Sequence, residues 1–335
     1  MAWNTFVYSI GHRTLRIDLQ LGTLLVTDQS LLLSLPAAHP NIIHVSFTPH
    51  EWDDRREGPE ASSIISTVSS DIVCGWNHLT YVNIAIPLAP RALLHLRDMP
   101  LLHVVRLTLE DSEGFEYLSR PSQSAFIAFR ELSISCSSVS SCSAFLNAMS
   151  WHHLESIEVN LPSVPYDPAD DDAVCMKMFF QVLSAQCSTT SLKRIFLAAY
   201  RFMPTNILDY TIEEDMLNPL LSFSDLTVLE ICSCHAFRIS NKSRLSLAGL
   251  VPLVQYCNDL VHLGIIVDAT IVNIPTYLPV SNSKVAYLNL HGSLIQDPAS
   301  VAACLSELLA RSSHGTAPHT SLYSQHIVSS SLEGS

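Results

Sequence analysis

Phe129-Arg130-Glu131-Leu132-Ser133-Ile134 contains the pattern that decides the fold, with apolar side chains at its first, fourth and sixth positions. The pattern recurs along the chain, and its fourth position falls at Val45, Val82, Leu107, Leu132, Ile157, Ile195, Leu229, Leu263 and Leu288, with a weaker copy at Leu15. From Val82 onward the intervals are 25, 25, 25, 38, 34, 34 and 25 residues. Repetition at intervals of roughly 20 to 50 residues is typical of proteins built from stacked units.

Each copy of the pattern is predicted to form a short β-strand. Its fourth and sixth positions lie two residues apart, so both face the same side of an extended chain. These two positions are apolar in all copies, from Leu15 and Ile17 to Leu288 and Leu290. The third and fifth positions face the other way and are mostly polar. We therefore expect one side of the sheet to be buried and the other to meet solvent or a partner.

The segments between the strands are predicted to be helices, because their apolar residues recur at helical spacing. Asp297 followed by Pro298 is a typical helix start, and Thr211 with Glu214 has the spacing of a capping box. The predicted helices span residues 61–73, 90–98, 141–150, 173–185, 246–257 and 297–311.

Together these elements predict an α/β fold, because alternating strands and helices favour a parallel sheet with helices packed behind it. At this repeat length we expect a leucine-rich-repeat solenoid over residues 1–311, a horseshoe with a concave parallel β-sheet and convex helices. Polar stretches near residues 49–61 and 162–172 are expected to be irregular, exposed insertions. Residues 312–335 are rich in Ser, His and Thr without periodicity, and we expect a disordered tail.

The composition predicts a packed, acidic protein. The 335 residues are 48% hydrophobic and 15% charged, which excludes a largely disordered chain. With 18 Lys and Arg against 31 Asp and Glu, the net charge is −13 and no basic run occurs, so we expect no nucleic-acid partner. Polar residues interrupt the apolar stretch from Leu19 to Leu35, which falls short of the roughly 20 apolar residues of a membrane helix. No membrane segment is therefore expected.

The cysteines favour a reducing compartment. There are nine of them, an odd number without the spacing of a disulfide framework, and the N-terminus has no secretory signal pattern. We therefore expect a cytoplasmic or nuclear chain with reduced thiols.

Two stretches carry a resemblance to a known family. They are Leu217 to Phe223 leading into Leu226 to Ile231, and Gly249 to Leu253 leading through Cys257 to Ile265. Here the chain resembles the fungal F-box and leucine-rich-repeat proteins, whose repeats commonly place a cysteine just before the strand. The resemblance implies the substrate-recognition repeats of a ubiquitin-ligase receptor. The F-box, the N-terminal segment that binds a Skp-type ligase adaptor, is not found in this sequence, so the adaptor is an expected partner only if an F-box lies upstream.

No catalytic, cofactor or metal motif stands out. Cys232, Cys234 and His235 offer three soft ligands where a structural zinc site needs four. The acidic stretch 167–172 lacks the glycine and glutamate of a calcium loop. Gly-x-Ser-x-Gly and the glycine loops that bind phosphates or dinucleotides are absent. We expect a protein that is not an enzyme and has no cofactor. The alternative is a hydrolase or zinc-dependent enzyme whose site residues are dispersed in the sequence.

The predicted binding surface is the polar side of the strands. Repeat proteins of this class bind protein partners on the concave sheet, where aromatic and long charged side chains are the natural anchors. The candidate binding residues are Tyr81, Arg106, Glu131, Glu158, Arg194, Phe196, Glu230, His262 and Tyr287. We therefore expect a protein–protein interaction scaffold.

Overall fold

The computed structural model describes residues 5–10, 13–21, 29–49, 59–109, 115–119, 128–136, 138–162, 172–200, 212–233, 243–272, 282, 284–290 and 293–309. The predicted insertions near 49–61 and 162–172 lie largely outside these residues, and so does the predicted tail 312–335. At the edges of the insertions, Pro49 ends a strand, Pro59 begins a helix, Pro162 ends a strand and Asp172 begins a helix.

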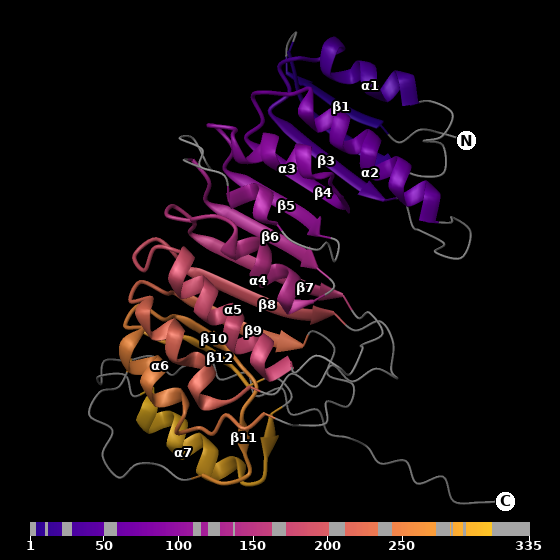
Figure 1. The fold of residues 1–335 in the computed structure, drawn as a ribbon. Coiled ribbons are helices and arrows are strands. Elements are labelled where there is room, and N and C mark those ends of the chain that lie inside the picture. The colour runs from indigo at the N-terminus through magenta and orange to yellow at the C-terminus, as the bar shows by residue number, and fades with distance from the viewer. Residues whose placement is uncertain are drawn as a thin grey trace, which may run out of the picture.

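The described chain alternates strands and helices (Figure 1). The large sheet contains β1 (Thr5–Ile10), β2 (Arg13–Leu21), β3 (His44–Pro49), β4 (Tyr81–Pro87), β5 (Val104–Leu109), β6 (Glu131–Cys136), β7 (Ser156–Pro162), β8 (Arg194–Tyr200), β9 (Val228–Ser233), β10 (His262–Gly264) and β12 (Tyr287–Asn289). A small sheet contains β11 (Asp268–Ala269) and β13 (Leu294–Ile295). The α-helices are α1 (Gln29–Ala38), α2 (Pro59–Cys74), α3 (Pro90–Arg97), α4 (Val139–Asn147), α5 (Asp172–Gln186), α6 (Leu250–Tyr256) and α7 (Pro298–Leu308). The 3-10 helices are η2 (Glu116–Ser119) and η3 (Glu214–Ser222).

The strands of the large sheet follow the order of the chain. Ten of these strands, from β2 to β12, are parallel, and each is paired with the strands next to it in the sheet. The predicted α/β class and the predicted parallel pairing are therefore confirmed. β1 is the exception, because it pairs antiparallel with β2 and places Thr5 opposite Leu19. The sequence analysis does not predict this hairpin.

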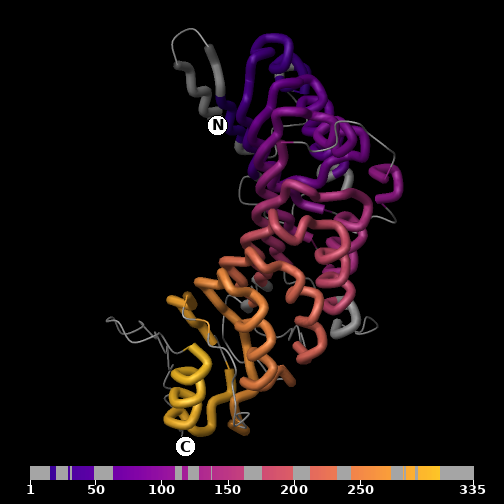
Figure 2. The backbone as a smooth tube through the Cα atoms, turned by 90° about the vertical axis from the view of Figure 1, so that its left-hand side faces the viewer, coloured from indigo at the N-terminus to yellow at the C-terminus, as the bar shows by residue number. Residues whose placement is uncertain are grey.

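The helices form a layer on one face of the sheet (Figure 1). Neighbouring helices pack on each other: α1 on α2, α2 on α3, α4 on α5, and η3 on both α5 and α6. The backbone follows a shallow arc, with both ends displaced to the same side of the middle (Figure 2). A strand and the helix after it therefore form one unit, and the units stack side by side.

The core lies between the sheet and the helices, and every unit contributes to it in the same way. Alternate strand residues such as Val82 and Ile84 in β4, or Ile157 and Val159 in β7, are buried. Another buried apolar residue lies three positions before the first of each pair. These residues are Ile42, Leu79, Leu102, Phe129, Leu154, Leu192, Leu226, Leu260 and Val285. The core is consequently continuous from β2 to β12.

Main-chain hydrogen bonds join each unit to the next where the strands begin. The carbonyl oxygen of His103, the residue before β5, accepts the N–H of Arg130 at 2.9 Å and that of Glu131 at 3.0 Å. The residue before each of the strands β3 to β10 does the same toward the following unit. These acceptors are Ile43, Thr80, His103, Arg130, Glu155, Lys193, Thr227 and Val261. The two N–H donors and the acceptor are main-chain groups, so this contact does not require a particular side chain, although the Thr80 and Thr227 hydroxyls add a bond to the same carbonyls.

In one copy of the repeat pattern, the strand register shows that the predicted fourth position is wrong by two residues. Val82 pairs with Val105, and Val105 pairs with Leu132, so the fourth position of this copy is Val105 and not Leu107. The predicted intervals of 25 and 25 residues are therefore wrong, and the residue numbers of these pairs give 23 and 27.

The predicted fourth position of the weak first copy is also wrong by two residues. Ile17, and not Leu15, pairs with Val45. Both errors are shifts of two residues, which leave each side chain on the predicted side of the sheet because that side alternates with a period of two.

Helices occur at all six predicted places, with ends that differ by a few residues. The predicted start of the last helix is confirmed, because the Asp297 carboxylate accepts the N–H groups of Ala299 at 3.0 Å and Ser300 at 3.3 Å. The sequence pattern does not predict α1, which contains Pro36.

The predicted capping box of Thr211 and Glu214 is wrong. The helix there is η3, and its box is formed by Glu213 and Met216. The Met216 sulfur accepts the N–H of Glu213 at 3.4 Å, and the Glu213 side chain accepts the N–H of Met216.

Replacing Leu229 with alanine is expected to lower the free energy of unfolding by about 2 to 5 kcal/mol, because this fully buried side chain would leave a cavity. Val228→Ala is the matched control, since Val228 precedes Leu229 on β9 and faces away from the core. We expect it to cost less than about 1 kcal/mol. Urea unfolding followed by circular dichroism measures both variants, and equal losses would contradict the assignment of the buried side.

Candidate binding surface

The strand side chains that point away from the helices form one surface, which we term the outer face. Residues in register on neighbouring strands lie side by side, so these side chains form two rows. The first row contains Arg16, His44, Tyr81, Val104, Glu131, Ser156, Arg194, Val228, His262 and Tyr287. The second row contains Asp18, Ser46, Asn83, Arg106, Ser133, Glu158, Phe196, Glu230, Gly264 and Asn289.

All nine candidate binding residues lie on the outer face. Tyr81, Glu131, Arg194, His262 and Tyr287 belong to the first row, and Arg106, Glu158, Phe196 and Glu230 to the second. Arg106, Arg194 and Tyr287 are exposed, whereas the other six are half-buried. Because the fourth position of the copy in β5 is Val105, Arg106 lies in the second row and not in the first, where the predicted assignment places it. The nine side chains thus share one surface from β4 to β12.

At the N-terminal end of the outer face, an aromatic stack lies beside an ion pair. The His44 and Tyr81 rings are stacked, with centroids 4.0 Å apart and planes 11° from parallel. Arg16 Nε donates to Asp18 Oδ2 at 2.8 Å. Burial lowers the pKa of His44 below its ordinary value, and the nearby Arg16 lowers it further, while Asp18 opposes the shift. His44 is therefore held in its neutral form at neutral pH.

In the middle of the outer face, charged side chains are paired across strands. Arg194 Nη2 on β8 donates to Glu131 Oε1 on β6 at 3.0 Å, passing over Ser156 on the strand between them. Asn160 Nδ2 donates to Glu158 Oε1 at 3.2 Å on the same strand. Both members of the Arg194–Glu131 pair are more than 40% exposed. The pair is consequently worth about 1 kcal/mol or less, and competes weakly with a partner.

At the C-terminal end, a second histidine–tyrosine contact occupies the equivalent place. The His262 and Tyr287 rings lie in the first row with centroids 4.3 Å apart and planes 34° from parallel. His262 Nε2 lies 3.2 Å from Glu230 Oε2, at ion-pair distance but without the alignment of a hydrogen bond. Tyr287 is 41% exposed. Each end of the outer face therefore carries an aromatic pair beside a carboxylate.

Sequence reasoning does not select Arg16, Asp18 or His44 as site residues. The missing signal is positional: His44 and Tyr81 occupy the same row on adjacent strands, as His262 and Tyr287 do. Comparing the copies with each other in the corrected frame would have revealed this repetition.

The predicted three-ligand cluster cannot be placed from the structure, since Cys234, His235 and the side chain of Cys232 lie outside the described residues. Among the residues that the structure does describe, no three His, Cys, Asp or Glu side chains group as metal ligands. Burial raises the pKa of Cys187 and of Cys257 to about 12. Both thiols therefore stay protonated and pack as small apolar groups.

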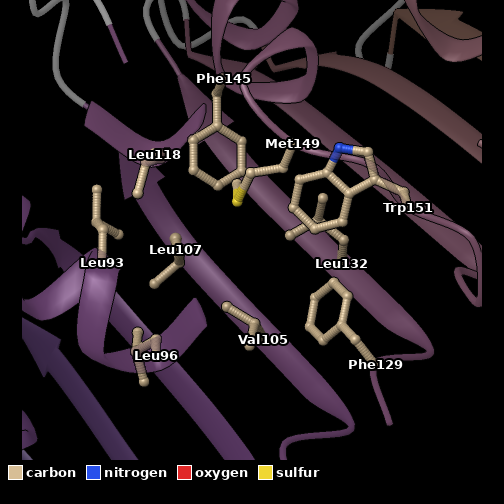
Figure 3. Close-up of a pocket in the computed structure, with 10 residues that line it drawn as sticks. All are labelled: Leu93, Leu96, Val105, Leu107, Leu118, Phe129, Leu132, Phe145, Met149 and Trp151. Carbon is tan, nitrogen blue, oxygen red and sulfur yellow. The ribbon is translucent and has the colours of Figure 1, made fainter. Parts of the chain in front are cut away.

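A small cavity lies on the helix side of the sheet, between β5, β6, α3, η2 and α4 (Figure 3). Its volume is about 10 Å³, which is at or below the room that one water molecule needs. Its lining is entirely apolar: Leu93, Leu96, Val105, Leu107, Leu118, Phe129, Leu132, Phe145, Met149 and Trp151. The cavity is therefore a gap in core packing, with neither the size nor the polar groups of a ligand site.

Comparison with known proteins adds no family. The sequence matches no protein-family model, and no curated protein is significantly similar to it. Within the described part of the chain, none of the helices has both the length and the apolar character needed to cross a bilayer.

The pH dependence of stability tests the environment of His44. In the folded chain the pKa of His44 lies below that of an unfolded chain, about 6.5, so the unfolded chain binds a proton more readily. The stability contributed by neutral His44 is therefore present above about pH 6.5 and is lost as the pH falls through the folded-state pKa. We expect His44→Gln to reduce the difference in unfolding free energy between about pH 7.5 and about pH 5, measured by urea unfolding.

His152→Gln is the control, because His152 is an exposed histidine in the turn before β7. It should leave that pH difference unchanged. A His44→Gln variant with the full pH dependence of the original chain would contradict the burial of His44.

Proposed function

We propose that the chain is a leucine-rich-repeat solenoid that binds a protein partner on the outer face without catalysing a reaction. The observation that carries this proposal is the outer face itself: two rows of side chains run across neighbouring strands from β2 to β12. The described helices pack on one face of the sheet, and the two rows lie on the other face (Figure 1). In the proposed horseshoe the outer face is the concave side, in keeping with the arc of the backbone (Figure 2).

The charges of the outer face favour a protein over a nucleic acid. Its arginines are Arg16, Arg106 and Arg194, and its carboxylates are Asp18, Glu131, Glu158 and Glu230. A phosphate backbone needs clustered cations. Here the two signs are mixed, and the whole chain carries a net charge of −13. Mixed charges with aromatic side chains among them are suited to the mixed surface of a folded or extended polypeptide.

The family resemblance suggests the class of the partner. In the F-box and leucine-rich-repeat proteins that the sequence resembles, the repeats hold a protein that is to be ubiquitinated. We propose the same role for the outer face, in the cytoplasm or nucleus, with a ligase adaptor as a second partner only if an F-box lies upstream of Met1. The free thiols of the described cysteines support a reducing compartment.

Alanine substitution of Arg106, Arg194, Phe196 and Tyr287 together tests the outer face. The full chain is used to capture a partner from an extract of its source cells, and the affinity of the purified partner is then measured by calorimetry. We expect the fourfold variant to bind at least about thirtyfold more weakly, because the loss of one or two anchors at an interface often costs about 2 kcal/mol.

The matched control places alanine at Arg91 and Met178, two exposed residues on the helix layer, and should bind as the original chain does. If the partner still binds the fourfold variant but no longer binds when residues 163–171 are deleted, the insertion is the binding site and the outer face is not. Stoichiometric zinc in the purified chain would instead favour the metalloenzyme alternative.

A further inference from the structure

We propose that Arg106 is the anchor of the outer face and binds an acidic side chain of an extended segment of the partner, with Tyr81 and Val104 holding an apolar side chain two residues away. This inference rests on the proposed function and specifies the chemistry of the partner.

The other charged side chains of the outer face already have partners within the chain. Arg16 pairs with Asp18, Arg194 with Glu131 and His262 with Glu230, while Glu158 accepts a hydrogen bond from Asn160. The Arg106 side chain is exposed, and it forms no ion pair or hydrogen bond with another residue that the structure describes. Its guanidinium therefore offers five N–H donors to a ligand without breaking a contact inside the protein.

The neighbours of Arg106 in its own row are polar and uncharged. Its neighbours in the second row are Asn83 on β4 and Ser133 on β6, both uncharged. Thr108 follows it on the same side of β5, opposite Ser135 of β6. None of these side chains competes for the guanidinium with a negative charge, and each can donate a hydrogen bond. A carboxylate seated on Arg106 would accept two parallel N–H bonds from it and further bonds from these groups.

Two apolar side chains lie beside Arg106. Val104 lies two residues before it on β5, and Tyr81 lies next to Val104 in the first row. One face of the Tyr81 ring is stacked on His44 at 4.0 Å, which fixes the ring in place. A fixed aromatic ring costs little conformational entropy on binding and is a typical interface anchor. Tyr81 and Val104 together therefore provide a half-buried apolar contact.

The spacing of the two rows sets the spacing in the partner. Outward side chains on one strand are roughly 7 Å apart, since each residue advances the strand by about 3.3 Å. In an extended partner segment, side chains two residues apart have the same separation and face the same way. The geometry therefore fits a segment with Asp or Glu at one position and an aliphatic or aromatic residue two positions away.

A peptide library displayed on phage, selected against the immobilised full chain, tests this inference. We expect the enriched peptides to contain an acidic residue two positions from an apolar one. A synthetic peptide of that sequence should bind Arg106→Ala at least about tenfold more weakly than the original chain. Arg106→Glu should bind a peptide whose acidic residue is replaced by Lys better than the original peptide. Arg91→Ala, an exposed arginine on α3, should change neither affinity.

The outcomes separate this inference from the proposed function. If the selected peptides lose affinity on Phe196→Ala or Tyr287→Ala but not on Arg106→Ala, the outer face is the binding surface and the assignment of Arg106 is wrong. Enrichment of basic peptides would also overturn it. If no peptide is enriched, or if substitutions on the outer face leave every selected peptide bound, both the inference and the proposed function are overturned. Circular dichroism of each variant confirms that it is folded.

Discussion

One carbonyl oxygen in each unit accepts two N–H groups from the next unit, and the rest of the structure depends on this contact. It occurs from Ile43 to Val261, at the residue before each of the strands β3 to β10. The residue that precedes this carbonyl is a buried apolar side chain, such as Leu102 before His103. The same short segment therefore fixes the hydrogen bonding between units and inserts a side chain into the core. A slip by one residue would bury the polar row and expose the apolar one, which strongly specifies the register.

The outer face follows from that register. Arg194 and Glu131 are 63 residues apart in the sequence, and they meet because β6, β7 and β8 lie in order with Ser156 between them. The variable intervals between strands have no effect on this alignment, because the extra residues lie outside the strands. The rows can thus juxtapose side chains that no sequence spacing would bring together.

Much of the fold is predictable from the sequence because each unit repeats the same physical requirements. The buried pairs, the parallel pairing and six of the helices follow from periodicity and helix-start residues. The frame of β5 does not, because Val105, Leu107 and Leu109 are all apolar and alternate, so a shift of two residues satisfies the same pattern. Only the pairing of Val105 with Val82 decides it. A purely local pattern lacks this information, and the antiparallel pairing of β1 is missed for the same reason.

The candidate site, too, is only partly predictable from the sequence. The side of the sheet on which Arg106 or Glu230 lies could be predicted, since it depends on alternation alone. The partners of these side chains could not be, since contacts such as that of Glu230 with His262 depend on which strands are adjacent and on side-chain rotamers.

The units are held together by main-chain atoms and by side chains on the opposite side of the sheet, which would separate recognition on the proposed binding surface from folding. Substituting a residue in either row changes what the surface presents but leaves the bonds between units and the core intact. Specificity in such a protein could be rewritten one position at a time, by mutation in nature or by design in the laboratory, with little loss of stability at each step. The scaffold would then serve as a common frame for many partners, each selected by a different combination of side chains in the two rows.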